Sequence, residues 1–201
     1  GGFLLCHLAA TTCYLGKYDQ AAEHFRQAEA WFNNTGNELG IAWHRHTQAR
    51  EYLRDQNHYQ LAVDALSVAL PMLEERTSPQ AVIENLLATV DCWCYIGTLD
   101  LVPEIMMRLD ALIIQYNRRW YSSEYLMMKG KVAFVTHDDK TAIRYLREGI
   151  GMVSLGGDIR LLSPLYRLLG MALSSDPETR DGATDAFDRS IRSEEHTSEL
   201  Q

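Results

Sequence analysis

A small residue, a large apolar residue and a second small residue recur along this chain at an interval of about 40 residues. Copies begin at Ala21, Ala62, Ala142 and Ala183, and a degenerate copy, Val102…Met106…Leu109, falls in the gap of this series. The successive intervals are 41, 40, 40 and 41 residues. An interval of this length is typical of stacked helix pairs, because no single pair can bury its apolar face alone. The repeat predicts an all-α fold, a right-handed α-solenoid of about five helix-turn-helix repeats.

The expected repeats cover nearly the whole chain. Five units of about 40 residues fit into 201 residues, of which 46% are apolar, enough for one continuous core. We expect a single domain over residues 1–191, whose repeats cover roughly residues 1–36, 37–77, 78–117, 118–157 and 158–191. Because residue 1 is Gly rather than Met, we expect the native start to lie upstream.

The first repeat shows how the pattern specifies a helical hairpin. Gly16 permits the tight turn, and Asp19 is expected to be the N-cap of the second helix. Ala21 is small where the two helices cross, and Phe25 with Ala28 fills the space toward the next pair. Small residues at a crossing allow helix axes to approach to roughly 8–10 Å.

This hairpin resembles a known repeat family. The run L-G-K-Y-D-Q-A-A-E-H-F-R-Q-A, residues 15–28, resembles the second half of a tetratricopeptide repeat (TPR), which implies a module that binds proteins or peptides. The family's first-helix signature is matched best by Tyr166, Leu169, Gly170 and Leu173. The interval of about 40 residues exceeds the family's usual 34, an excess that longer helices explain.

Two positions depart from the family pattern. In the second repeat Arg50 falls where a small residue is expected. Either Ala49 takes that place in a helix one residue longer, or the two helices cross more loosely. In the fourth repeat Lys129 stands at the usual leucine position, so its stem must snorkel or the register must shift.

A narrower resemblance covers residues 124–173. This stretch is similar to the helical sensor regions of bacterial multidomain signal-transduction ATPases, regulators of the maltose-regulon-activator type, and to cyclase–ATPase fusions. In such proteins the repeats follow a nucleotide-binding module and bind an inducer or a partner protein. The resemblance implies the sensor or scaffold region of a larger bacterial signalling or transcriptional regulator. The alternative is a plain protein–protein assembly scaffold without a ligand switch.

The last ten residues, 192–201, resemble a translated sequencing adapter. They read R-S-E-E-H-T-S-E-L-Q, which is the in-frame translation of a common adapter sequence. We therefore expect the native sequence to end near Ile191, and we assign no function to the residues after it.

Composition and missing motifs narrow the function further. The net charge of −8 argues against a nucleic-acid-binding segment, which should be basic. No apolar run reaches the roughly 18 residues of a membrane span and no signal peptide is visible, so we expect a cytoplasmic segment without membrane contact. No GxxxxGK[ST] motif or catalytic constellation is present, so we expect neither an enzyme nor a cofactor.

Cysteine and methionine side chains are candidates for a metal site, for disulfides or for a binding surface. Cys92 and Cys94 are separated by one residue, which places their thiols on different helix faces, so with His44 and His46 they do not predict a zinc site. Cys6 and Cys13 are too far apart on one helix to pair, which favours reduced thiols. The pairs Met106-Met107 and Met127-Met128 suit either core packing or an adaptable binding surface.

The remaining candidate site is the inner groove of the solenoid, lined by the first helix of each pair. Its residues mix both charges with apolar side chains, which suits a protein or peptide partner, or a small-molecule inducer, better than a phosphate-rich ligand. The predicted groove residues are Thr47, Glu51, Arg54, Glu84, Leu87, Asp91, Glu124, Met127, Lys131 and Arg167.

Overall fold

The computed structural model describes residues 1–77, 79–116, 121–155, 158–175 and 179–199. Within these residues the regular structure is helical, with no β-strand. The chain divides into two compact units, Gly1–Leu112 and Ile113–Gln201, and the division falls inside the sixth α-helix. The predicted all-α fold of helical repeats is confirmed, whereas the predicted repeat limits stay predictions.

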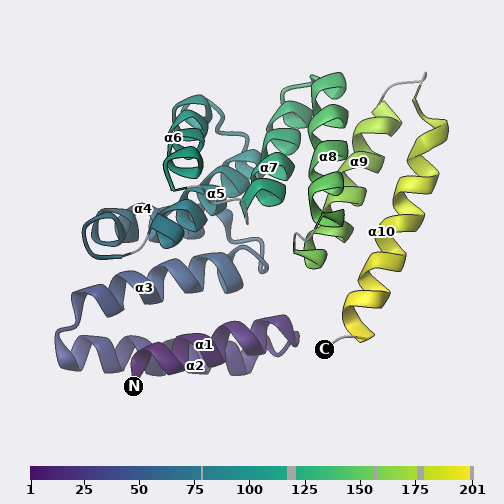
Figure 1. Ribbon diagram of the computed structural model, residues 1–201. Helices are drawn as coiled ribbons and strands as arrows, with labels where there is room; N and C mark the ends of the chain where they lie inside the picture. The colour runs from purple at the N-terminus through teal and green to yellow at the C-terminus, as the bar shows by residue number, and fades with distance from the viewer. Residues whose placement is uncertain (78, 117–120, 156–157, 176–178, 200–201) are drawn as a thin grey trace. The chain divides into compact units, whose positions relative to one another are not determined.

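Unit 1 is a series of helices that each pack on the next. α1 contacts α2, α2 contacts α3, α3 contacts α4 and α4 contacts α5 (Figure 1). α1 also contacts α3, so the first helices of these two neighbouring pairs meet. The helices are α1 (Gly2–Tyr14), α2 (Tyr18–Thr35), α3 (Glu38–Gln48), the π-helix η1 (Ala49–Leu53), α4 (Tyr59–Arg76), α5 (Pro79–Ile96) and α6 (Val102–Gln115).

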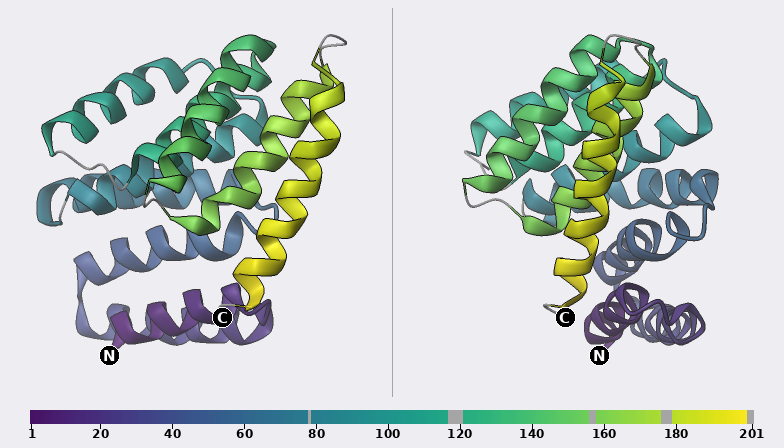
Figure 2. Two further views of the ribbon diagram at one scale, coloured as in Figure 1. Left: turned by 45° about the vertical axis from the view of Figure 1, so that its right-hand side comes forward. Right: turned by 90° about the vertical axis from the view of Figure 1, so that its right-hand side faces the viewer.

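Unit 2 repeats the same arrangement. α7 contacts α8, α8 contacts α9 and α9 contacts α10, and both views of Figure 2 show the last three helices side by side. α7 also contacts α9. The helices are α7 (Ser122–Val135), α8 (Asp139–Ser154), the 3-10 helix η3 (Ile159–Leu161), α9 (Leu162–Ser175) and α10 (Asp181–Glu199). None of the described helices combines the length and the apolar character that crossing a membrane requires.

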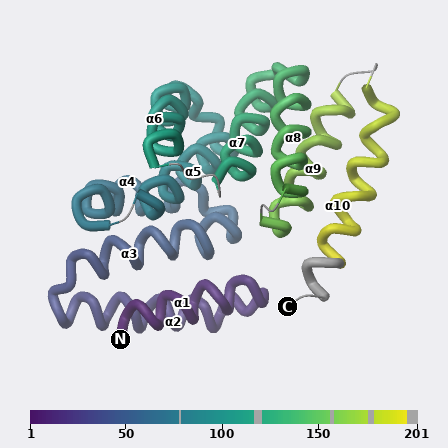
Figure 3. Tube along the Cα trace, in the orientation of Figure 1, coloured from purple at the N-terminus to yellow at the C-terminus, as the bar shows by residue number. Residues whose placement is uncertain are grey.

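In four repeats the first helix ends at a residue with a left-handed backbone conformation. The positive φ angles are 68° at Gly16, 59° at Asn57, 83° at Gly97 and 62° at His137, at intervals of 41, 40 and 40 residues. At all four of them the next N–H donates to the carbonyl five residues back, as in Lys17 N–H to Thr12 O at 2.9 Å. This pattern is a Schellman turn, which reverses the chain after each helix (Figure 3).

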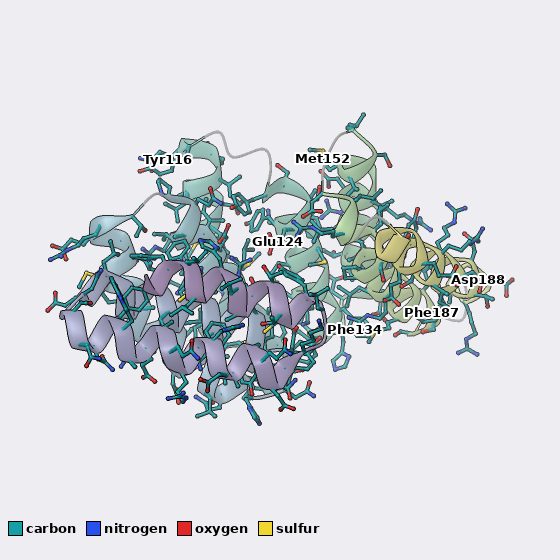
Figure 4. The ribbon with its side chains drawn as sticks, turned by 90° about the horizontal axis from the view of Figure 1, so that it is seen from below. Tyr116, Glu124, Phe134, Met152, Phe187 and Asp188 are labelled. Atoms are coloured by element: carbon teal, nitrogen blue, oxygen red, sulfur yellow. The ribbon has the colours of Figure 1, made fainter. Side chains whose placement is uncertain are left out.

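Small residues occupy the helix crossings, as the repeat predicted. Ala21, Ala62 and Ala142 are fully buried. A Cβ on Gly130 would lie only 2.6 Å from Cγ of Leu146, so α7 and α8 approach closely enough to exclude a methyl group. At Gly170 the obstacle is the ring of Phe187 on α10, at 2.7 Å (Figure 4).

The unusual second repeat contains a π-helical turn. After α3, η1 (Ala49–Leu53) forms a wider turn, in which the Arg54 N–H donates to the Ala49 carbonyl at 3.2 Å. Ala49 is 1% exposed and packs in one core cluster with Ala62 and Leu66. Of the two alternatives, the longer helix is therefore confirmed: Ala49 takes the small position, and the π-turn accommodates the extra residue.

The extra residue is visible in the spacing between the small residue and the left-handed turn residue. The interval is seven residues from Ala9 to Gly16 and from Gly130 to His137, but eight from Ala49 to Asn57. A π-turn absorbs one inserted residue without changing the helix on either side, so the downstream turn keeps its place.

The start of α2 differs from the expected N-cap. α2 begins at Tyr18 with Lys17 as its N-cap residue, so the prediction that Asp19 is the N-cap is wrong. Asp19 lies in the first turn, where its charge is favourable near the positive end of the helix dipole. Side-chain caps occur elsewhere: the Asn37 side chain accepts from Gly40 N–H at 2.8 Å, and Asp138 accepts from Thr141 N–H at 3.1 Å.

Lys129 follows the snorkelling alternative. Its side chain is partly buried, and its Nζ lies 4.5 Å from the centroid of the Tyr125 ring and 5.6 Å from that of Tyr145. The aliphatic stem of Lys129 therefore fills the position of the family's leucine. Its ammonium group lies near the two aromatic rings, which attract a cation.

The segment that resembles a sequencing adapter continues α10 as far as Glu199. Within it, Oε1 of Glu194 accepts a hydrogen bond from Oγ of Ser163 on α9 at 2.7 Å. Helical structure does not reveal the origin of a sequence, so the adapter assignment stays a prediction.

Candidate partner-binding surface

An ion-pair network joins the π-turn to α5 in unit 1. Arg50 pairs with Glu84 of α5 and with Glu51, whose Oε1 lies 3.5 Å from Nη2 of Arg50. Nε2 of His46 lies 3.7 Å from Oε2 of Glu84. The side chains of Glu51 and Glu84 are 13% and 15% exposed, so solvent screens these pairs less than it screens surface ion pairs.

The network continues at the end of the π-turn. Nη1 of Arg54 lies 3.7 Å from Oδ2 of Asp91 on α5, and its Nε lies 3.9 Å from Oδ1 of Asp55. Burial opposes the charged form of Arg54, but Asp91, Glu51 and Asp55 outweigh it and raise its pKa. Burial, Glu51 and Asp91 raise the pKa of Asp55 despite the opposing effect of Arg54.

Carboxylates outnumber cations in this network. We name it the acidic surface of unit 1 and define it as Arg50, Glu51, Arg54, Asp55, Glu84 and Asp91. Two guanidinium groups face four carboxylates, so the cluster carries a net charge of −2 when all six groups are ionised. Such a cluster attracts the basic side chains of a partner.

Four of the predicted groove residues, Glu51, Arg54, Glu84 and Asp91, lie together in this surface. Thr47 is half-buried on α3, where its Oγ1 donates to the Trp43 carbonyl at 2.9 Å. Leu87 is 1% exposed, and this burial excludes it from an open groove. Leu87 is a core residue of α5 because nearly every face of that helix is covered.

The other four predicted residues belong to unit 2. Glu124 lies near the beginning of α7, whose other end carries Phe134 (Figure 4). Met127 packs against the core of the unit, and Lys131 is 8% exposed, so neither offers much surface to a partner. Arg167 on α9 is exposed. A groove that includes the other nine residues remains a prediction.

Sequence reasoning missed four residues in and beside the network, Arg50, Asp55, His46 and Asn85. Asn85 is fully buried, donates to the Leu66 carbonyl at 3.2 Å and lies 3.5 Å from Nδ1 of His46. His46 is 2% exposed, and burial lowers its pKa despite the neighbouring Glu84. One sequence signal indicated the network: Arg50 is a charged residue at a position where the repeat requires a small one.

The cysteines are buried thiols. None of the four forms a disulfide, and burial raises the pKa of Cys6 and of Cys13 to about 12, with Asp55 and Glu51 adding to the effect at Cys13. No group of three or more histidine, cysteine or acidic side chains is placed to hold a metal ion in the described part of the chain.

The methionine pairs divide between the two alternatives. Met128 is 3% exposed and belongs to the core, as core packing requires. Met107 is 68% exposed on α6 and does not belong to the core. Met127 is partly buried against the core of unit 2.

Comparison with known proteins supports the repeat assignment in unit 1. The family model described as tetratricopeptide repeat matches residues 3–75, which include α1, α2, α3, the π-turn and nearly all of α4. No curated protein matches the chain significantly. The matched segment also contains Arg50, Glu51, Arg54 and Asp55 of the acidic surface. Residues 3–75 thus form a helical region similar to tetratricopeptide repeats, which generally mediate protein–protein interaction.

Proposed function

We propose that the chain is a non-catalytic protein- or peptide-binding module, and that the acidic surface of unit 1 takes a basic segment of its partner. The observation that carries the proposal is the cluster of four carboxylates around Arg50 and Arg54 within and beside a tetratricopeptide-like region. Repeats of this family bind protein or peptide partners.

The chemistry of the surface indicates how a partner would be held. Asp55 and Asp91 both lie within ion-pair range of Arg54. A lysine or arginine of a partner is attracted by the four carboxylates of the acidic surface, which outnumber its two guanidinium groups. Because these side chains are only partly exposed, the new pair forms in a less screened environment than open solvent.

At the level of the whole protein we propose the sensor or scaffold region of a larger cytoplasmic bacterial regulator. The resemblance of residues 124–173 to the sensor regions of signal-transduction ATPases supports it. The bound partner, or a small-molecule inducer, would favour one arrangement of the repeats and so bias an attached output domain. The competing proposal is an assembly scaffold without a switch, which the repeat by itself supports equally.

The acidic surface is tested by neutralising two of its carboxylates. In Glu51→Gln/Asp91→Asn, we expect binding of a fluorescein-labelled lysine-rich peptide to weaken by about ten-fold, measured by fluorescence anisotropy at 50 mM salt. Lys131, which lies on the other unit and is buried, is left unchanged.

The matched control is Asp64→Asn/Glu75→Gln, which removes the same charge from exposed positions of α4. We expect it to bind like the wild type, and circular dichroism should show the same helicity for all three proteins. Equal weakening in both double variants would refute the assignment, because net charge alone would then explain the effect.

Sequencing of the source locus across both ends separates the regulator from the scaffold. A GxxxxGK[ST] motif upstream in the same reading frame supports the regulator, whereas flanks that hold only further repeats support the scaffold. The same reads test whether residues 192–201 belong to the gene.

A further inference from the structure

Unit 2 contains a groove between α8 and α10, with α9 as its floor. The groove encloses a cavity of about 310 Å³. It is lined by Arg147, Ile150, Tyr166, Leu169, Leu173, Gly182, Asp185, Ala186 and Arg189. None of these residues belongs to the predicted inner groove, and all of them precede the segment that resembles a sequencing adapter.

The floor of the groove is apolar. Leu169 and Leu173 of α9 are 6% and 3% exposed, and the partly buried Ile150 of α8 packs against the same core. The wall on α10 is low because Gly182 has no side chain and Ala186 has only a methyl group. An apolar floor beneath small residues leaves room for a leucine-sized side chain.

The rim of the groove is positively charged, in contrast to the chain as a whole. Arg147 and Arg189 stand against a single carboxylate, Asp185, which lies 2.8 Å from Nε of Arg189. The guanidinium of Arg189 also lies 5.8 Å from the centroid of the Tyr166 ring. The groove is thus a cationic site on a chain whose net charge is −8.

The groove continues past Tyr166. A second cavity of about 460 Å³ shares Tyr166, Asp185 and Arg189 with the first and adds Ile159 and Leu162 to the apolar floor. Its remaining lining residues, Arg192 and Ser193, belong to the segment that resembles a sequencing adapter. The two cavities therefore follow α9 and place Tyr166 and Arg189 at their junction. The length of this path suits a peptide segment better than one small molecule.

We propose that this groove binds an acidic peptide segment of a partner, with an apolar side chain on the floor and a carboxylate on Arg147 or Arg189. The guanidinium fork matches a carboxylate in a two-point contact. The site differs in place and sign from the acidic surface of unit 1, and it rests on the proposed function only in that both take protein partners.

The test uses a fluorescein-labelled peptide of alternating aspartate and leucine and the full chain. In fluorescence anisotropy at 50 mM salt we expect saturable binding, which Arg147→Glu weakens by about ten-fold. Gly182→Met should weaken it to a similar extent without a change of charge, because its side chain would occupy the cavity. A Cβ on Gly182 lies 3.5 Å from Leu173 Cδ1, an ordinary contact, so the helix tolerates the substitution.

The matched control is Arg144→Glu, an equal change of charge on α8 outside the groove. We expect it, and the unit 1 variant Glu51→Gln/Asp91→Asn, to bind the acidic peptide as the wild type does. Absence of saturable binding up to about 1 mM peptide overturns the proposal, as does an equal loss in Arg144→Glu. In Glu51→Gln/Asp91→Asn, a lysine–leucine peptide that binds as tightly as the acidic peptide also overturns it, whereas failure of lysine-rich peptide binding at unit 1 leaves it standing.

Discussion

Gly130 and Gly151 both lie inside helices of unit 2, but their surroundings differ. A Cβ on Gly130 would overlap Cγ of Leu146, which is fully buried, whereas nothing lies within 4 Å of a Cβ on Gly151. At Gly151 the missing side chain only lowers helix stability, because glycine loses more conformational entropy on folding. At Gly130 the missing side chain also allows α7 and α8 to cross closely.

We therefore expect opposite effects from the same substitution. Gly130→Ala should lower the free energy of unfolding by about 1 kcal/mol or more, because overpacking exceeds the gain in helix propensity. Gly151→Ala should raise it by up to about 1 kcal/mol. Urea titrations followed by circular dichroism measure both, and a stabilising Gly130→Ala would show that α7 and α8 do not cross as closely as described.

Two buried histidines predict how stability depends on pH. Burial lowers the pKa of His44, whose Nε2 lies 3.1 Å from the Phe25 carbonyl, and burial lowers the pKa of His46 beside Glu84. Because the folded pKa is below the unfolded value of about 6.5, the neutral forms stabilise the fold fully above that pH. This stability is lost as the pH falls below about 6.5 toward the folded pKa.

Each histidine should contribute a slope of up to about 1.4 kcal/mol per pH unit in that range. Urea denaturation at pH 7.5 and 5.5 measures the difference. In His44→Gln/His46→Gln the dependence should flatten, whereas the exposed His58→Gln should retain it. Equal wild-type stability at the two pH values would contradict the expectation.

At the scale of the element, η1 is a one-residue insertion that the fold tolerates. It lengthens the interval from Ala49 to Asn57 to eight residues, one more than in the first and fourth repeats. The same turn contains Arg50 and Glu51 and is followed by Arg54 and Asp55, so η1 and the two residues after it contribute four of the six residues of the acidic surface. π-turns often occur at functional sites, and here the turn also keeps Ala49 in the core.

Deletion of Arg50 should therefore convert α3 and η1 into one regular helix. We expect the protein to remain folded and to lose at most about 3 kcal/mol of stability, mainly from the partly buried Arg50–Glu84 pair. Deletion of Val63 from α4, which has no π-turn, rotates Leu66 and Leu73 away from the core by about 100° and should cost more than about 5 kcal/mol. Thermal melts followed by circular dichroism compare the two, and equal losses would mean that η1 absorbs no insertion.

At the scale of the whole molecule, the contacts within each unit link neighbouring helices. In repeat proteins stability is approximately a sum over repeats and their neighbours, so a defect should spread only a short distance. Leu66 of unit 1 and Leu146 of unit 2 occupy equivalent repeat positions and are both fully buried, which makes them a matched pair.

Leu66→Ala should destabilise its surroundings by about 2–5 kcal/mol. Hydrogen exchange followed by mass spectrometry should show faster exchange in α3 and α4 but little change in α8 and α9. Leu146→Ala should show the reverse distribution. If either variant accelerated exchange to the same extent in both units, the chain would unfold as one cooperative body instead.

The repeat interval, the turn at Gly16 and the alanines at the crossings were readable from the sequence. They depend on residues that are neighbours along one helix or across one turn, such as Gly16 and Ala21. Helix geometry converts such local spacing directly into position, and the all-α fold follows from that relation. For the second repeat the sequence left two alternatives open, and the burial of Ala49 decided between them.

The acidic surface and the burial of individual groove residues were decided by tertiary structure. Arg50 and Glu84 are 34 residues apart, and only the packing of η1 and α4 with α5 brings them together. The repeat predicted which helices carry Leu87 and Lys131, but a helix covered on most of its faces buries residues that an amphipathic pattern leaves exposed. Periodicity acts within one helix, whereas burial and ion pairing depend on which faces of separate helices meet.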